Sequence, residues 1–294
     1  MEVDRTLSIG AQDVVLDVGS GHLPHPSAAV LVDRFPDDPS QRLGLDIVRD
    51  RAFIAADVER LPFRDKAFDY VIASHVLEHT ADPIAAAAEL SRVGRRGYVE
   101  MPTEIWELLF GWEFHTYAAT LASDGTIVFK RKSRPQPPLG ELFYRVSDHD
   151  PTFGEVILSH PELFYVSVEW DDHIPCRLDA TPWPESLDAS DYVARIRTVR
   201  PSPQLALRTF ARMAVARSVR RLVRRLAPAG PARPARRRAP AVDLADVMAC
   251  PACRSSALRW GTDAIDCIDC RRSFEINQGV PVMLLRDAVP HGSP

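Results

Sequence analysis

Several features are scarce in this 294-residue chain, and each scarcity excludes a class of protein. No run approaches the roughly 18 consecutive apolar residues that a membrane-spanning helix needs, so we expect no membrane span. The first residues, MEVDRTLSIG, include two acids and no apolar core, which argues against a secretory leader and for a cytoplasmic location. Five cysteines are too few for a disulfide scaffold of this length, and four of them cluster late in the chain.

Acidic residues are missing altogether from residues 192–242, which hold 14 of the 36 basic residues, all of them arginine. The remainder of the chain carries 22 basic against 40 acidic residues. The stretch 227–240 (APAGPARPARRRAP) reads as an extended linker, and residues 204–226 have a helical composition. Such a segment is either a solvated linker or an arm that binds RNA or another acidic partner.

What is present points to an α/β fold. Short β-branched runs at 14–18, 29–32 and 70–72 alternate with a predicted helix over 82–93, where Asp82 is the expected N-cap and Pro83 begins the first turn. This alternation predicts a Rossmann-like, mostly parallel sheet covered by helices on both faces. Further along, a hairpin is expected between 117–121 and 126–130, and a late strand over 163–170.

A glycine turn follows the first strand in Asp17-Val18-Gly19-Ser20-Gly21. Glycines at such a turn let a ligand approach the backbone closely. Pro24 and Pro26 delay any helix after the turn, which disfavours a pyrophosphate at a helix N-terminus. Asp33 ends the second strand, where a carboxylate can accept hydrogen bonds from both ribose hydroxyls.

Four motifs in register resemble the class I S-adenosylmethionine-dependent methyltransferases. They are DVGSG at 17–21, VDRF at 32–35, ADVERLPFRDKAFDYV at 56–71 and SHVLEHTADP at 74–83. The resemblance covers roughly residues 11–103 and is weaker to about 190. The two prolines at 24 and 26 depart from the family pattern at the amino-acid end of the cofactor.

The resemblance implies a role for each matching residue. Asp17, Gly19 and Gly21 would shape the site for the methionine moiety, and Asp33 would hold the ribose. Asp57 and the Val58 backbone would meet the adenine amino group. Ser74 and His75 would lie beside the sulfonium and the methyl acceptor.

A catalytic base is needed only if the acceptor must lose a proton. The candidates are His75, His79, Glu100, His115 and His149. We favour His75 because it follows the strand that faces the reactive end in the resembled fold, with His115, in an aromatic-rich stretch, as the second choice. For His79 a packing or capping role is the better interpretation, and for His115 aromatic core packing is an equal alternative.

The late cysteines form two CxxC pairs, Cys250/Cys253 and Cys267/Cys270, separated by 13 residues. This spacing predicts a tetrahedral four-cysteine zinc site of the ribbon type, although spacing alone leaves iron open. The segment 242–286 also resembles the small zinc-ribbon activator of translation-machinery methyltransferases. That resemblance implies that Val280–Leu285 docks on the N-terminal domain in cis. A ribbon that binds nucleic acid or another protein is the alternative.

We therefore expect a methyltransferase domain over 1–190, an Arg/Pro-rich helix and linker over 191–241, and a zinc ribbon over 242–294. The expected activity is S-adenosylmethionine-dependent methylation of a small molecule, lipid or saccharide intermediate, because no Asn-Pro-Pro-Tyr-type amide-recognition motif occurs. Methylation of tRNA, rRNA or a translation factor, self-activated by the ribbon, is the alternative. A third possibility is a non-catalytic scaffold that keeps the fold.

Overall fold

A computed structural model describes residues 7–38, 44–132, 157, 160–183, 240–285 and 289–290. The arginine-rich segment predicted over 191–241 lies outside these residues except for its last two, and so does His149. No helix in the described part of the chain is long and apolar enough to cross a bilayer.

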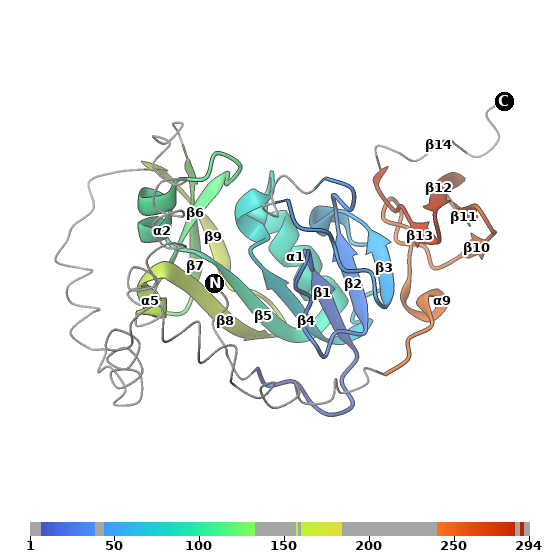
Figure 1. Ribbon diagram of the computed structural model, residues 1–294, viewed down its shortest axis with the longest axis horizontal. Helices are drawn as coiled ribbons and strands as arrows, with labels where there is room; N and C mark the ends of the chain where they lie inside the picture. The colour runs from blue at the N-terminus through green and yellow to red at the C-terminus, as the bar shows by residue number, and fades with distance from the viewer. Residues whose placement is uncertain are drawn as a thin grey trace, which may run out of the picture.

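A six-stranded sheet forms the centre of the molecule, in the order β3-β2-β1-β4-β5-β8 (Figure 1). The first five strands are parallel and β8 is antiparallel to β5, so the predicted mostly parallel sheet is confirmed. The strands are β1 (Val15–Val18), β2 (Val30–Asp33), β3 (Ala52–Ala55), β4 (Phe68–Ser74), β5 (Gly94–Pro102) and β8 (Tyr165–Asp171).

The predicted helix is α1 (Pro83–Val93), and its N-cap is confirmed because the Asp82 carboxylate accepts hydrogen bonds from the amides of Ile84 and Ala85, both at 3.0 Å. Two 3-10 turns, η2 (Val58–Arg60) and η3 (Leu77–His79), follow β3 and β4.

The expected alternation of strands and helices is wrong at the first connections. Among the described residues, α1 is the only α-helix between two neighbouring parallel strands. Pro24 and Pro26 fall in the β1–β2 link, where proline cannot donate the hydrogen bonds of a helix. The face of the sheet that carries Val15 and Leu31 is covered instead by Leu7, Ile9 and Ile47.

A second sheet of three strands lies beside β5 and β8. It consists of β6 (Tyr117–Leu121), β7 (Ile127–Lys132) and β9 (Cys176–Trp183), and the antiparallel pairing of β6 with β7 confirms the predicted hairpin. The helix α2 (Glu104–Phe110) leads into it, and α5 (Pro161–Phe164) precedes β8. The late strand therefore begins after the predicted residue 163, because Pro161 starts a helical turn there.

The C-terminal unit begins with α9 (Leu244–Val247) and continues as a small sheet. Its strands are β10 (Leu258–Trp260), β11 (Ala264–Cys267), β12 (Arg272–Asn277), β13 (Val280–Pro281) and β14 (Val289–Pro290). The unit lies against the β3 edge of the central sheet (Figure 1).

Backbone hydrogen bonds join the two parts at two places. The amide of Met283 donates to the Ala55 carbonyl at 2.8 Å, and Val282 pairs with Ala55 in parallel, which extends the central sheet beyond β3. The amide of Ala249 donates to the Pro62 carbonyl at 2.9 Å. The segment 280–285 thus contacts the N-terminal domain at β3, as its predicted docking requires.

Candidate functional site

The turn after β1 has the backbone that a close-approaching ligand needs. Gly19 and Gly21 have φ angles of 69° and 51°, in the left-handed region that favours glycine. A side-chain carbon added at Gly19 would come within 2.4 Å of the Val76 side chain, which follows β4. The turn after β1 therefore packs against the turn after β4, and the hydroxyl of the intervening Ser20 is buried without a hydrogen-bond partner.

Asp17 is buried at the end of β1, and its carboxylate accepts a 2.7 Å hydrogen bond from the His25 amide. Burial raises the pKa of Asp17 from 3.8 to about 7, against the opposing effects of that hydrogen bond and of the Arg51 charge. A buried carboxyl of this kind binds a proton or a cation, so it suits the amino group of an amino-acid ligand.

Asp33 and Asp57 lie at the same edge of the sheet, after β2 and β3. The Asp33 carboxylate accepts hydrogen bonds from the amides of Gly21 (3.2 Å) and Phe35 (2.9 Å). The Asp57 carboxylate caps η2 through the Glu59 amide (3.0 Å), and a guanidinium nitrogen of Arg34 lies 3.1 Å from it. The next residue, Val58, is buried.

The far side of this edge is formed by the C-terminal unit. Arg34, Asp57 and Arg60 line a small pocket together with three residues of the segment after β13, Met283, Leu284 and Leu285. Residues from both parts of the chain therefore border the position assigned to the adenine.

Ser74 ends β4 and His75 follows it with a φ of 57°, which is unusual for a residue with a side chain. The His75 amide donates to the Glu100 carbonyl at 2.8 Å, and the ring Nδ1 lies 3.3 Å from Oε1 of Glu78. The His75 side chain is 42% exposed, whereas that of Glu78 is 2% exposed. The buried Glu78 carboxylate thus orients the solvent-accessible His75 imidazole.

Three imidazoles lie around the Glu78 carboxylate. Burial by itself would raise its pKa, but His75, His79 and His115 outweigh burial and lower the pKa of Glu78 to about 2. His115 lies behind His79, with ring centroids 4.7 Å apart, and is itself buried. The structure therefore separates the two predicted catalytic histidines: His75 faces the open side, and His115 lies in the interior.

Aromatic side chains gather beside His75. Its ring meets that of Tyr165 edge to face at 5.7 Å, and Trp106 lies 5.1 Å from Tyr165. Phe110 stacks on Trp106 at 4.2 Å. Most of this cluster comes from α2 and the start of β8, so the aromatic-rich stretch predicted from the sequence supplies a wall next to the proposed acceptor position.

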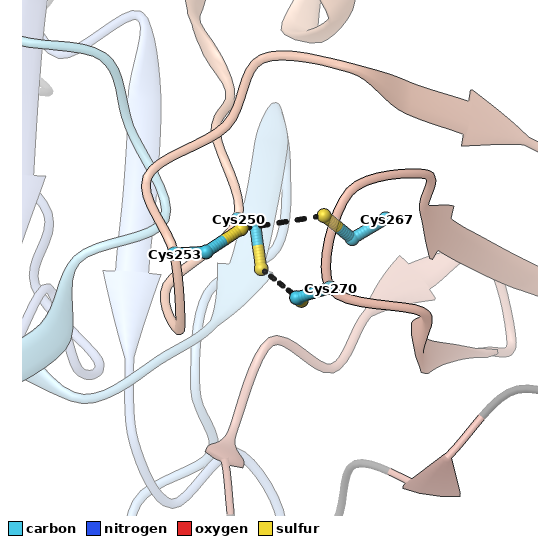
Figure 2. Close-up of side chains that lie close together, drawn as sticks. All are labelled: Cys250, Cys253, Cys267 and Cys270. Atoms are coloured by element: carbon cyan, nitrogen blue, oxygen red, sulfur yellow. Dashed lines mark hydrogen bonds between the residues drawn. The ribbon is translucent and has the colours of Figure 1, made fainter.

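The four late cysteines converge in the C-terminal unit (Figure 2). The sulfur atoms of Cys250 and Cys270 are 3.6 Å apart, and those of Cys253 and Cys267 are 3.5 Å apart. Tetrahedral zinc–sulfur bonds of about 2.3 Å place sulfur atoms about 3.8 Å apart, so the group fits a zinc ion without large rearrangement. None of the four forms a disulfide, and Cys176 lies outside the group.

Three participants were not predicted from the sequence. Arg34 directly follows Asp33, but its pairing with Asp57 depends on the sheet order. Glu78 stands three residues after His75, a spacing that could have suggested the contact once a helical turn was assumed. Glu107, which contacts His115, had no sequence signal.

Comparison with known proteins finds a match for the part of the sheet that carries Asp33, Asp57 and His75. Residues 32–99 match the family model described as "Methyltransferase domain". The demethylmenaquinone methyltransferase of Beutenbergia cavernae is 38% identical over 80 residues, which cover 25% of this chain and 33% of that protein. The ubiquinone/menaquinone biosynthesis C-methyltransferase UbiE of Xanthomonas campestris is 27% identical over 177 residues, 53% of this chain and 63% of that protein.

The chain thus spans less than two thirds of the length of these relatives. Among solved structures, a complex of the Haloferax volcanii Trm112 methyltransferase activator with a methyltransferase aligns at 21% identity and a TM-score of 0.25, over 31% of this chain and 45% of the matched chain.

Proposed function

With a methyltransferase domain at residues 32–99 as the premise, we propose that the protein transfers a methyl group from S-adenosylmethionine to a small molecule. One observation carries this proposal: Asp17 next to the end of β1, Asp33 at the end of β2, and Asp57 after β3 lie at the same edge of the sheet where His75 follows β4. Ligands of open α/β sheets bind at this edge.

The residues at this edge fit S-adenosylmethionine. Gly19 and Gly21 give the turn its left-handed backbone, and the buried Asp17 carboxylate would hold the amino group. Asp33 would accept from the ribose hydroxyls. Asp57 and the Val58 backbone would hold the adenine. Bound there, the cofactor supplies an electrophilic methyl group.

His75 would accept the proton that an acceptor hydroxyl or acidic carbon loses on methylation. Because Nδ1 faces the Glu78 carboxylate, it carries the hydrogen, and Nε2 is the atom left to act as the base. Ser74, which ends β4, would lie beside the sulfonium. The chain's contribution is mainly to position the acceptor and to exclude water.

The acceptor would be a small molecule with an apolar, flat part. Support comes from the half-buried Trp106, which packs on the buried Phe110 and Tyr165 next to His75, since aromatic side chains stack on flat ligands. It also comes from relatives that are named for quinone biosynthesis. The four cysteines would hold zinc and make the C-terminal unit a ribbon that stabilises the sheet in cis.

The test is calorimetric titration of the zinc-loaded protein with S-adenosylmethionine and S-adenosylhomocysteine. We expect micromolar binding that weakens at least tenfold in Asp33→Ala, about 1.4 kcal/mol, because the ribose loses its acceptor. Asp65→Ala is the matched control, since Asp65 is an exposed aspartate paired with Arg92 away from the sheet edge. The absence of binding by folded protein would favour a scaffold that keeps the fold without the activity.

RNA is the alternative acceptor, and the 14 arginines of 192–242 support it. Phosphate contacts weaken as salt rises. Retention of tRNA or rRNA at low salt that is lost on deletion of 217–238 would favour this alternative. No retention at low salt would exclude it and leave the small-molecule acceptor.

A further inference from the structure

A buried group of three potential metal ligands lies behind His75, away from the four cysteines. Glu78 and His79 belong to η3, and His115 precedes β6. One ligand atom of each residue lies within 4.8 Å of the others. The Thr116 amide donates to the Glu78 carbonyl at 2.7 Å, so the backbone already ties the two segments together.

Among the described residues, the Glu78 carboxylate is paired only with imidazoles and with no lysine or arginine. Glu78 is 1% exposed, and neither of its carboxylate oxygens has a hydrogen bond. The nearest side-chain nitrogens are Nδ1 of His75 at 3.3 Å and Nε2 of His79 at 4.0 Å, both on imidazoles that are charged only when protonated. A buried carboxylate without a cation or hydrogen-bond donors is strongly destabilising, so the group has room for a positive charge.

The two nearby lysines, Lys130 and Lys132, are already paired with other carboxylates. Lys132 donates to Glu107 at 2.7 Å, and Lys130 lies 3.3 Å from Glu104. Their charges therefore neutralise carboxylates of α2, and the Glu78 carboxylate is left with imidazoles as its cationic partners.

The His115 imidazole is held as metal-bound imidazoles usually are. Nδ1 of His115 contacts the fully buried Glu107 carboxylate, which leaves Nε2 as the atom free to bind a metal. A carboxylate on the second ring nitrogen is the common partner of a histidine ligand. The His79 ring stacks on Phe114 at 5.5 Å, and its Nδ1 is buried with no hydrogen-bond partner.

We propose that Glu78, His79 and His115 bind a divalent transition-metal ion at a site separate from the four cysteines. Two imidazoles and one carboxylate suit zinc, cobalt, manganese or iron, whereas four thiolates favour softer ions. The ion neutralises Glu78 and joins the turn after β4 to the β6 hairpin, so it fixes the carboxylate that faces His75.

The experiment uses full-length protein dialysed against a chelator too weak to strip four thiolates, with one zinc per chain verified by elemental analysis. Cobalt(II) is then added. We expect visible ligand-field absorption that saturates at one further equivalent and lacks the near-ultraviolet charge-transfer band of cobalt–thiolate bonds. No such absorption, or absorption accompanied by the thiolate band, would overturn the proposal.

Variants locate the site within the chain. Glu78→Gln keeps the side-chain shape and should lower cobalt affinity by at least tenfold, and His115→Ala should abolish the absorption. His173→Ala, a histidine outside the group, should bind as the parent does. Unchanged binding in both ligand variants would exclude these residues. Should His115→Ala fail to fold by circular dichroism, the shape-conserving Glu78→Gln variant and the parent spectrum still decide the question.

Discussion

The sheet domain and the C-terminal unit are stabilised in different ways. The sheet domain buries large apolar side chains throughout its core, among them Leu16, Phe63, Phe68 and Leu90, all at most 1% exposed. The described C-terminal unit has far fewer such residues: beyond the buried Cys250 and Cys267, its most buried large side chains are those of Met248, Ile265, Phe274 and Met283. Short segments of this kind need a cross-link or a metal to stay folded, because apolar burial alone does not offset the loss of chain entropy.

The two parts nevertheless share one core. Met248, Cys250 and Met283 belong to the same buried cluster as the strand residues Val32 and Ile54. The C-terminal unit, for which we propose a zinc ion, therefore supplies part of the packing of the central sheet. We therefore expect that loss of the metal destabilises the C-terminal unit first and then β3, the strand that the unit contacts.

The largest expected effect is the loss of one cysteine ligand. Cys270→Ser should remove the zinc, whose binding contributes on the order of 10 kcal/mol in small zinc domains, and unfold residues 250–285. Amide hydrogen exchange should become fast there and faster in β3, where the Met283–Ala55 hydrogen bond is lost, while β4 and β5 stay protected.

Cys176→Ser is the matched control, because Cys176 is a free cysteine outside the four-cysteine group. It should leave exchange in residues 250–285 unchanged. Equal protection in Cys270→Ser and the control would show that the C-terminal unit holds together by packing alone, and the contrast between the two parts would disappear.

A smaller effect is expected from the titration of Asp17 in the sheet domain. The pKa of Asp17 is about 7 in the folded protein and 3.8 in the unfolded chain. Between about pH 4 and 7, the folded state therefore holds a proton that the unfolded state has lost. The free energy of unfolding should therefore fall as pH rises through this window, and Asp17→Asn should remove that part of the fall. Urea titrations of both proteins at several pH values measure the difference.

Asp37→Asn serves as the control, because Asp37 is an exposed aspartate of the same domain. Its pH dependence should parallel that of the parent protein. If Asp17→Asn also parallels the parent, the buried carboxyl at the end of β1 is ionised well below pH 7.

Features set by neighbouring residues could be predicted from the sequence. The Asp82 N-cap, the hairpin around Asp124 and the absence of a helix after Gly21 all follow from local backbone preferences of aspartate, glycine and proline. The CxxC pairs are local in the same sense, since a turn brings the two sulfur atoms of each pair together.

The rest of the site depends on tertiary packing. His115, 37 positions after Glu78, meets it only because β6 packs against η3, and no spacing rule encodes that contact. The Arg34–Asp57 pair likewise requires β2 and β3 to be neighbours. Sequence reasoning consequently named residues that the structure brings to one edge of the sheet, where strand ends define the geometry, and missed the buried charges behind it. The roles of these residues toward a cofactor stay predictions.

The smallest effect concerns the ion pair that joins the two parts. Arg254 of the C-terminal unit lies 3.0 Å from Glu89 of α1 and is 62% exposed, so water and salt screen the pair. Arg254→Gln should lower the free energy of unfolding by about 0.5 kcal/mol or less, because Glu89 keeps its contact with Arg92 at 2.8 Å.

The control is Arg259→Gln, which removes an equally exposed arginine that pairs with Asp266 inside the C-terminal unit. It should leave amide hydrogen exchange at β3 unchanged. Faster exchange at β3 in Arg254→Gln alone would show that this surface pair helps to dock the unit. Equal exchange in both variants would assign the docking to the backbone pairing of Val282 with Ala55 and to the shared apolar core.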